Sequence, residues 1–269
     1  MKRFLKFILP NGIVDFIRNR RKLRNVGRRL SPGELFSASR LALEADTSGL
    51  TLFPPGYAEK LRYVVDVGAN VGQWSGMLLG CVTPQKLIIA EPIPAAFAVL
   101  EEKFGNNRCV ELHNVAIGER EGVARLKITR DTTGASLLQP REEMRAVIGG
   151  NWAVASEIEV KMTTLDRLLA DLNEVSLLKI DVQGYEKPVM AGARQTLVKT
   201  KFVLIELNFM PQYDAGSWLG EIHEILTRDF GFFLANATAP LILNGRASMC
   251  DGLYVNPNLV QEWVKPDFV

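Results

Sequence analysis

The sequence predicts an α/β protein with a doubly wound, mostly parallel sheet, and three observations lead to this prediction. An apolar run at residues 63–67 enters a glycine-containing turn, which is followed by a helical stretch at residues 73–79. Short apolar runs and helical patterns then alternate along the chain, as they do in sheets covered by helices on both faces. Carboxylates end four of the predicted strands: Asp66, Glu91, Asp181 and Glu206. The carboxyl ends of parallel strands meet at one edge, where open α/β sheets bind their ligands.

The remaining elements follow from periodicity and turn residues. Further strands are predicted at 87–90, 110–115, 175–180, 202–207, 232–236 and 253–255. Helices are predicted at 95–104, 165–171, 186 to about 197, and 218–227, with a capping pattern from Thr163 to Asp166. Residues 123–128 and 158–162 alternate apolar and polar positions, which predicts an antiparallel addition. The long segment between them, 131–156, contains three glycines and is a candidate lid.

The N-terminal 29 residues differ from the rest of the chain in charge. They hold ten Lys/Arg and one Asp, a net of +9, whereas the remainder holds 22 basic and 29 acidic residues, a net of −7. An acidic body is a poor surface for nucleic acid. Apolar residues at helical spacing, with no run long enough to cross a bilayer, indicate either a basic amphipathic helix on a membrane or a solvated arm.

Composition sets the domain organisation and excludes some classes of site. We expect a basic extension and helical connector at 1–60, with one helix at 33–45, and a single α/β domain at 61–269. The three cysteines are far apart and form neither a disulfide framework nor a zinc pattern, which indicates buried, reduced thiols in a reducing compartment. With His113 and His223 as its only histidines, the chain cannot form a multi-histidine metal centre.

The turn after the first strand predicts a nucleotide-type site that does not suit a dinucleotide. The pyrophosphate fingerprint is G-x-G-x-x-G, whereas here Gly68 and Gly72 are four apart and Asn70 stands where a second glycine is wanted. Both glycines permit close backbone approach. Asp66 would repel a pyrophosphate but suits the ammonium group of S-adenosylmethionine. The alternative is a glycine turn with a capping aspartate.

Glu91 is the second candidate for cofactor binding. It ends the strand that follows the glycine turn, 25 residues after Asp66. An acidic residue at that position accepts hydrogen bonds from the hydroxyl groups of a bound ribose. Taken alone, an acidic strand end is more often a cap or a surface charge, and Asp66 is what favours the ribose role here.

Several segments together resemble the FkbM family of S-adenosylmethionine-dependent methyltransferases. They are D-V-G-A-N-V-G at 66–72, E-P at 91–92, N-V-A-I-G at 114–118, G-A-S at 134–136, T-L-D at 164–166, L-K-I-D-V-Q-G-Y-E at 178–186 and D-G-L-Y-V at 251–255. The resemblance implies a class I methyltransferase fold with a reversed last hairpin. It also implies that Asn114 and Ala116 join the cofactor site. Two departures are Gln183, where many relatives have Glu, and a serine-rich stretch reduced to Ser136.

Family members methylate hydroxyl groups, often on sugars of glycans and glycolipids or on polyketides. The resemblance therefore implies an O-methyltransferase, and we expect a sugar hydroxyl as the acceptor. A sugar hydroxyl is a poor nucleophile and needs a general base. Asp181 is the leading candidate, with a hydrogen bond to the cofactor's ammonium as its alternative role. Glu206 is the second catalytic candidate. It could instead join Asp181 and Asn208 as a magnesium ligand, but we assign no metal.

Two other functional classes compete with this prediction. One is a non-catalytic subunit of a glycan-assembly complex, which the intact glycine turn and both Asp66 and Glu91 disfavour. The other is a nicotinamide oxidoreductase, which Asn70 disfavours. The basic head adds a prediction about location, because clustered Lys/Arg are attracted to anionic lipid headgroups. We expect an enzyme held peripherally on the cytoplasmic face of a membrane through residues 1–29.

Overall fold

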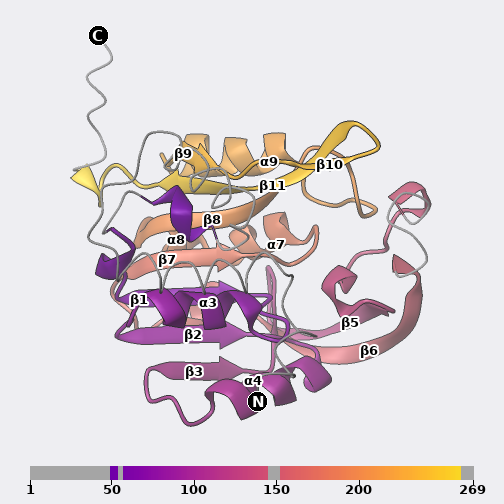
Figure 1. The fold of residues 1–269 in the computed structure, drawn as a ribbon, viewed down its shortest axis with the longest axis horizontal. Helices are drawn as coiled ribbons and strands as arrows, with labels where there is room; N and C mark the ends of the chain where they lie inside the picture. Colours follow the sequence, from indigo (N-terminus) through magenta and orange to yellow (C-terminus); the bar gives the residue numbers. More distant parts are fainter. Residues whose placement is uncertain (1–48, 54–56, 145–151, 262–269) are drawn as a thin grey trace, which may run out of the picture.

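The structure is a computed structural model that describes residues 49–53, 57–144 and 152–261 (Figure 1). The predicted connector helix at 33–45 and the basic head at 1–29 lie outside the described residues. Residues 49–53 and 57–60, which belong to the predicted connector, pack on the main sheet through the 3₁₀ turns η1 (Leu50–Leu52) and η2 (Ala58–Lys60). The Phe53 ring, for example, meets Phe202 edge to face at 5.0 Å between centroids.

The main sheet has the strand order β10-β11-β8-β7-β1-β2-β3, with β9 paired to β11. Its strands are β1 (Tyr63–Val67), β2 (Lys86–Ala90), β3 (Val110–His113), β7 (Val175–Ile180), β8 (Thr200–Asn208), β9 (Phe233–Ala237), β10 (Leu241–Leu243) and β11 (Arg246–Val255). The five strands from β8 to β3 are parallel, and β11 joins β8 antiparallel. The prediction of a mostly parallel sheet with a reversed last strand is confirmed.

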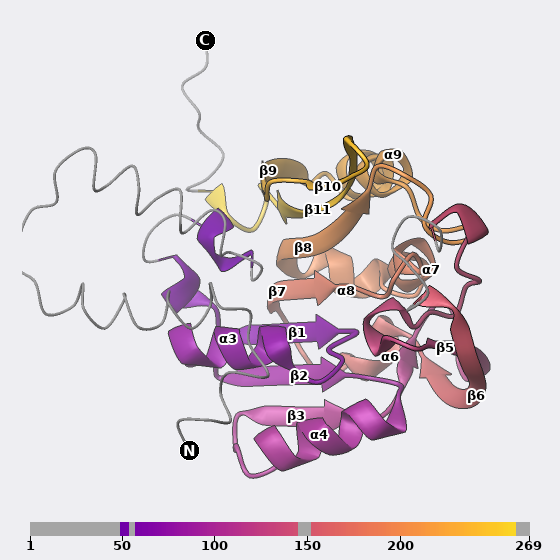
Figure 2. The same cartoon turned by 45° about the vertical axis from the view of Figure 1, so that its right-hand side comes forward.

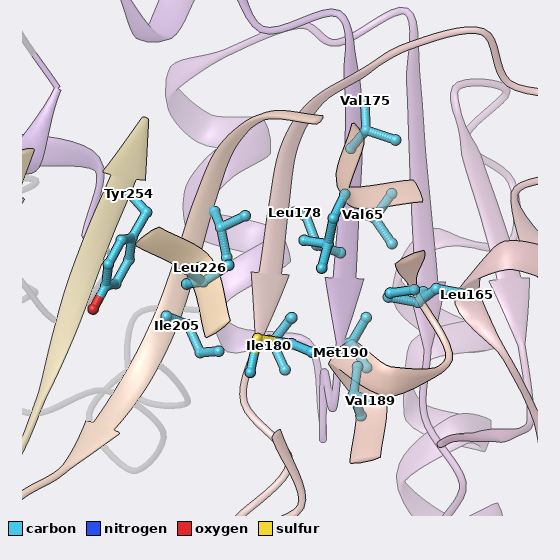
Figure 3. Packing of buried hydrophobic residues seen from close by; sticks show 14 of the residues in the cluster. Val65, Leu165, Val175, Leu178, Ile180, Val189, Met190, Ile205, Leu226 and Tyr254 are labelled. Carbon is cyan, nitrogen blue, oxygen red and sulfur yellow. The ribbon is translucent and has the colours of Figure 1, made fainter. Parts of the chain in front are cut away.

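Helices cover both faces of this sheet because its strands are apolar on both sides (Figure 2). One face packs against α3 (Gln73–Cys81) and α4 (Pro94–Phe104). The other packs against α6 (Leu165–Leu168), α7 (Glu186–Ala191), α8 (Arg194–Val198), α9 (Leu219–Glu224) and the π-helical turn η5 (Ile225–Asp229). Figure 3 shows this second layer, in which Leu178 and Ile180 of β7 pack with Val189 and Leu226.

A small second sheet stands beyond the carboxyl ends of the main strands (Figure 1). It contains β4 (Ala116–Ile117), β5 (Gly122–Thr129) and β6 (Val154–Thr163), and η3 (Thr132–Gly134) follows β5. The predicted antiparallel pairing of 123–128 with 158–162 is confirmed. The predicted third strand, 110–115, was too long. The chain leaves the main sheet after His113, and residues 116–117 pair with β6 of the small sheet instead.

Three further predictions needed correction. The segment 186–197 forms two short helices rather than one, and α6 ends at Leu168 rather than at residue 171. The cap of α6 is Thr164, not Thr163: its hydroxyl accepts from the Arg167 amide at 3.2 Å. Asp166 caps a different helix, since its carboxylate accepts from the amides of Gln195 and Thr196 at the start of α8.

Strand register places a row of charged side chains on one face of the sheet. Asp66 of β1 lies opposite Lys179 of β7, and Glu206 of β8 lies opposite Asp251 of β11. Leu204 pairs with Lys179, and side chains two residues apart share a face, so all four belong to the face that α3 covers. That face is apolar toward the amino ends of the strands and charged toward their carboxyl ends.

No helix within the described ranges is long and apolar enough to cross a membrane.

Candidate active site

A cavity of about 250 Å³ opens at the carboxyl edge of the parallel strands, where the sequence predicts the site. Its wall includes five of the predicted site residues: Gly68, Asn70, Glu91, Ala116 and Asp181. Residues 132–133 and 135–137 of the predicted lid form another part of the wall. The other predicted site residues lie outside this lining: Asp66, Gly72, Asn114 and Glu206.

Gly68 and Gly72 are both required by packing within the protein. Gly68 has φ of 81°, and a Cβ added to it would lie 1.9 Å from the backbone oxygen of Asp181. The turn after β1 therefore passes close against the end of β7, and Gly68 lines the cavity. Gly72, with φ of 73°, lets α4 approach, because a Cβ there would lie 2.6 Å from Leu100 and 2.5 Å from Phe104. A direct contact of Gly72 with cofactor stays a prediction.

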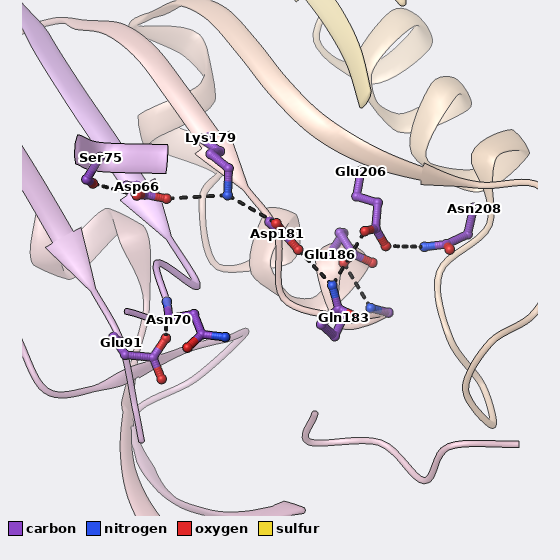
Figure 4. A network of polar contacts seen from close by, with 11 residues as sticks. Asp66, Asn70, Ser75, Glu91, Lys179, Asp181, Gln183, Glu186, Glu206 and Asn208 are labelled. Atoms are coloured by element: carbon purple, nitrogen blue, oxygen red, sulfur yellow. Dashed lines mark hydrogen bonds and ion pairs between the residues drawn. The ribbon is translucent and has the colours of Figure 1, made fainter. Parts of the chain in front are cut away.

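Asn70 and Glu91 form one wall of the cavity (Figure 4). Asn70 adopts φ of 50°, a left-handed conformation that asparagine tolerates better than most residues. The backbone amide of Asn70 donates to Glu91 Oε2 at 2.7 Å, and the backbone amide of Ile93 donates to Glu91 Oε1 at 2.8 Å. Burial raises the pKa of Glu91 to about 7, although these two amides oppose the rise. Each carboxylate oxygen keeps a lone pair for a further donor.

Asn114 supports this wall from behind. Its side-chain amide donates to the backbone oxygens of Glu91 at 2.8 Å and Pro92 at 3.1 Å. These bonds fix the turn that follows β2, and with it the position of the Glu91 carboxylate. Ala116, two residues later, lines the cavity directly. The cofactor contact predicted for Asn114 remains a prediction.

Asp66 lies behind the cavity rather than on its wall. Its side chain is fully buried, accepts from the Ser75 hydroxyl at 2.6 Å, and has its other oxygen 3.5 Å from the Lys179 ammonium. Burial raises the pKa of Asp66, against the opposing attraction of Lys179 and the hydrogen bond from Ser75. The predicted contact of the Asp66 carboxylate with the ammonium group of the cofactor therefore stays a prediction.

Lys179 is a site residue that the sequence analysis missed. Its ammonium lies 3.2 Å from Asp181 Oδ2 and 5.6 Å from the centre of the Trp74 ring, and it lines the cavity. Burial opposes its charge, but the carboxylates of Asp181, Asp66 and Asp251 outweigh that effect and raise the pKa of Lys179 above its usual value. The available signal was a lysine inside a mostly apolar strand.

Asp181 is held on both sides and still reaches the cavity. Lys179 donates to its Oδ2 at 3.2 Å, and the Gln183 side chain donates to its Oδ1 at 2.9 Å. The Asp181 side chain is 33% exposed, whereas that of Asp66 is 0% exposed. Of the two carboxylates beside Lys179, only Asp181 is therefore open to a bound molecule.

Glu206 lies deeper than Asp181 on the same face of the sheet. Its Oε1 accepts from Asn208 at 3.1 Å and its Oε2 lies 3.5 Å from Gln183 Nε2 (Figure 4). Burial raises the pKa of Glu206 well above its usual value, and Asp181 adds to the rise. Glu206 is thus placed behind Gln183 and not on the cavity wall, and its catalytic role stays a prediction.

Glu186 and Asp251 complete the acidic surroundings. Glu186 is fully buried, accepts from the Gly184 amide at 2.9 Å, and has its pKa raised to about 7, chiefly by burial. Asp251 lines the cavity from β11 and was missed as a site residue. The motif at 251–255 was visible in the sequence. Only the antiparallel register shows that Asp251 lies opposite Glu206.

Neither histidine lines the cavity. His223 contacts the Tyr254 hydroxyl at 3.1 Å, and His113 contacts Glu111 at 2.7 Å on the edge strand β3. Within the described residues, no three His, Cys, Asp or Glu side chains converge closely enough to hold a metal ion. The magnesium alternative, in which Asn208 joins Asp181 and Glu206, stays a hypothesis.

The cavity suits a ligand that carries positive charge and hydroxyl groups. Its charged lining residues are Glu91, Asp181, Asp251 and Lys179, three carboxylates against one ammonium. Asn70 Oδ1 is buried without a hydrogen-bond partner, so it can accept from a ligand. S-adenosylmethionine carries a sulfonium, an ammonium and a ribose diol. Glu91 and Asn70 Oδ1 would hold it by accepting hydrogen bonds from its hydroxyl groups, and the apolar wall formed by Ile93, Ala116 and Ile117 among others would receive its adenine.

The chain is similar to known methyltransferases. The family model described as the methyltransferase FkbM domain matches residues 66–234. A 2-O-methyltransferase, NoeI, of Sinorhizobium fredii is 28% identical over 61% of this chain and 70% of its own length. The 31-O-demethyl-FK506 methyltransferase FkbM of Streptomyces tacrolimicus is 27% identical over 66% of this chain and 75% of its own length.

Among solved structures, the chain is similar to a methyltransferase FkbM from Methylobacillus flagellatus. The identity is 16%, the TM-score is 0.42, and the match covers 90% of this chain but only 60% of that protein. The match to the FkbM family spans more than half of this chain, from Asp66 near the end of β1 to Leu234 in β9. The protein belongs to the FkbM family of methyltransferases, and S-adenosylmethionine is its cofactor.

Proposed function

We propose that this protein transfers a methyl group from S-adenosylmethionine to a hydroxyl oxygen, most readily that of a sugar in a glycan or glycolipid, with Asp181 as the general base. The observation that carries the proposal is the exposure of Asp181. Its carboxylate is 33% open at the cavity, while the neighbouring carboxylates of Asp66 and Glu206 are buried behind it. The names of two relatives, a 2-O-methyltransferase and a 31-O-demethyl-FK506 methyltransferase, support transfer to a hydroxyl group.

The mechanism needs three contributions from this chain. When bound, S-adenosylmethionine supplies an activated, electrophilic methyl group. Glu91 and Asn70 bind the cofactor, which fixes the position of that group. Asp181 would accept the proton of the acceptor hydroxyl, a role worth roughly 100-fold or more in rate. Alignment of the acceptor oxygen with the methyl group provides the remainder of the acceleration.

Water exclusion falls to the segment that follows β5. Thr132, Thr133 and Leu137 line the cavity. This segment is anchored to the turn after β7, because the Ser136 hydroxyl donates to the backbone oxygen of Gln183 at 2.7 Å. It is also anchored by Tyr213, whose hydroxyl lies 3.1 Å from the backbone oxygen of Gly134. In this proposal the segment closes the cavity over the reacting groups.

The experiment that tests the proposal follows a labelled methyl group. The protein is incubated with radiolabelled S-adenosylmethionine and cell extract, and the products are separated into lipid, polysaccharide, protein and small molecules. Label in a hydroxyl group of a carbohydrate-containing fraction is the expected result, with strongly reduced label for D181N. Label in protein would contradict the proposed acceptor. Binding of S-adenosylhomocysteine without any transfer would favour the non-catalytic alternative.

The proposal includes a location. Residues 1–29 carry a net charge of +9, which is attracted to anionic lipid headgroups, and a lipid-linked acceptor would give that attraction a purpose. We therefore place the protein peripherally on the cytoplasmic face of a membrane. These residues lie outside the described part of the chain, so the proposal rests on their sequence alone.

A further inference from the structure

Figure 4 shows the Gln183 side chain between the carboxylates of Asp181 and Glu206. It occupies the turn after β7 with φ of 55°, an unusual conformation for a residue with a long side chain. Its Nε2 lies 2.9 Å from Asp181 Oδ1 and 3.5 Å from Glu206 Oε2. Its Oε1 lies 3.0 Å from the Tyr213 hydroxyl. The side chain thus stands between two carboxylates and one phenol.

Hydrogen-bond chemistry determines which way the Gln183 amide points. A primary amide has two donor hydrogens on nitrogen and an acceptor oxygen. The reverse orientation would set the amide oxygen against Asp181 and Glu206, which are acceptors when ionised. In the observed orientation, the nitrogen donates to both carboxylates, and the oxygen accepts from the Tyr213 hydroxyl, whose single hydrogen is shared with the backbone oxygen of Gly134. Burial raises the pKa of Tyr213 far above its usual value, so this phenol keeps its proton.

We propose that Gln183 is a positioning residue that holds the Asp181 carboxylate toward the cavity and separates it from the buried carboxylate of Glu206. The proposal rests on the general-base role of Asp181. Through its backbone oxygen, Gln183 also anchors Ser136, so one turn aligns the base and the segment that covers it. Its uncharged side chain donates to both carboxylates and adds no negative charge beside them.

The charged and titratable groups around this position come from several elements. They are Lys179 of β7, Asp181 just after β7, Glu186 of α7, Glu206 of β8, Tyr213 of the loop after β8, Asp251 of β11 and, behind Lys179, Asp66 of β1. Lys179 is the cation among them. An ionised carboxyl group at residue 183 would therefore be repelled by the neighbouring carboxylates at alkaline pH.

The variant Q183E separates positioning by hydrogen bonding from simple occupation of space. When protonated, the new carboxyl group can donate one hydrogen bond to Asp181, as the amide does. When ionised, it repels both Asp181 and Glu206. The folded-state pKa of the new group is therefore raised, so its destabilising effect is small at acidic pH and grows as pH rises through that pKa. Turnover relative to wild type should fall in the same direction.

The test uses the full chain, radiolabelled S-adenosylmethionine and the cell fraction that wild type labels. Q183L should lower turnover roughly tenfold or more at every pH, because no donor then holds Asp181 from this side. Q183E should approach wild type near pH 5.5 and fall roughly tenfold or more below it by pH 8.5. Calorimetry should find S-adenosylhomocysteine affinity unchanged in both. Q195E, the same substitution at an exposed position of α8, should show no pH-dependent loss.

Wild-type turnover in Q183L would overturn the inference, and so would a ratio of Q183E to wild-type turnover that does not vary with pH. Weakened S-adenosylhomocysteine binding with unchanged maximal turnover would also overturn it, since Asp181 would then act on the cofactor. The pH dependence of thermal unfolding needs no acceptor. If wild type labels no fraction, the proposed function fails. A larger loss of Tm for Q183E at pH 8.5 than at pH 5.5 would still support the charge arrangement, and equal losses would refute it.

Discussion

Lys179 lies directly opposite Asp66 in the register of β7 and β1, and its ammonium nitrogen is 3.5 Å from Asp66 Oδ1. The same nitrogen lies 3.2 Å from Asp181 Oδ2, so one buried cation serves a buried carboxylate and a carboxylate open to the cavity. The pair couples the stability of the sheet to the geometry of the site, because any change at Lys179 affects both.

Replacement of Lys179 should therefore damage the fold as well as the site. K179M leaves Asp66 as a buried acid without its cation, and loss of one member of a buried ion pair costs about 3–5 kcal/mol. Denaturant unfolding measures this loss. The loss should shrink at acidic pH, where Asp66 is protonated, and the double variant D66N/K179M should be more stable than K179M. A double variant no more stable than K179M would refute the pairing.

Cofactor affinity should depend on pH through Glu91. Its pKa is raised to about 7, and the ionised form is the better acceptor for a ribose diol. We expect calorimetric affinity for S-adenosylhomocysteine to fall roughly tenfold per pH unit below pH 7. E91Q should remove this dependence, and E91A should weaken binding by about 1.5–3 kcal/mol at pH 8. A pH-independent affinity in wild type would exclude Glu91 as the titrating ligand.

The same shift acts on stability with the opposite preference. Since the folded-state pKa of Glu91 lies above its usual value of 4.5, the fold favours the protonated carboxyl group. The contribution of Glu91 to the free energy of unfolding is fully present below about pH 4.5 and is lost as the pH rises to about 7. Without cofactor, E91Q should lose less stability than wild type between these pH values, as measured by thermal unfolding.

Replacement of Asp181 distinguishes a role in proton transfer from a role in cofactor binding. D181N keeps the size of the side chain but cannot accept a proton, so turnover should fall roughly 100-fold or more, a larger effect than the loss of folding stability from the weakened pairing with Lys179. If Asp181 instead binds the ammonium of the cofactor, D181N should weaken S-adenosylhomocysteine binding and leave maximal turnover largely intact. Steady-state kinetics with saturating cofactor, together with calorimetry, distinguishes the two roles.

Gly68 and Gly80 form a matched pair for the turn after β1. G68A places a Cβ 1.9 Å from the backbone oxygen of Asp181 at a residue with positive φ, and it should cost about 1–3 kcal/mol and perturb the cavity. Gly80 lies in α3, where a Cβ meets nothing within 4 Å. G80A should stabilise by about 0.5–1 kcal/mol. Equal effects of the two substitutions on unfolding would contradict the close approach of Gly68 to the Asp181 backbone.

Membrane attachment can be tested by flotation with liposomes that contain about one-third anionic lipid. Each Lys or Arg near such a surface contributes about 1 kcal/mol, and the contribution is screened by salt. The full chain should float at low salt and be released at high salt. A chain that begins at Ser31 should remain in solution. If both chains remain in solution equally, residues 1–29 are a solvated arm.

Local sequence patterns were sufficient for the order of elements and for the residues around the glycine turn. The strand at 63–67 is apolar, Gly68 supplies a positive φ, and the helix after Gly72 begins at Gln73 as predicted. Glu91 and Asp181 were predicted at the cavity because parallel strands bring their carboxyl ends to one edge. Each of these inferences depends on neighbours within a few residues or on a general rule of sheet topology.

Only the tertiary structure decided how the charged groups divide the work. Asp66 and Asp181 look alike in the sequence, as carboxylates at the ends of buried strands, yet Asp66 is enclosed by Ser75 and Lys179 and Asp181 is open. Asp251 reaches the cavity only because β11 pairs antiparallel with β8 in one particular register. Burial of one carboxylate rather than another and the register between strands arise from packing between segments far apart in the chain, and periodicity within a segment does not specify either.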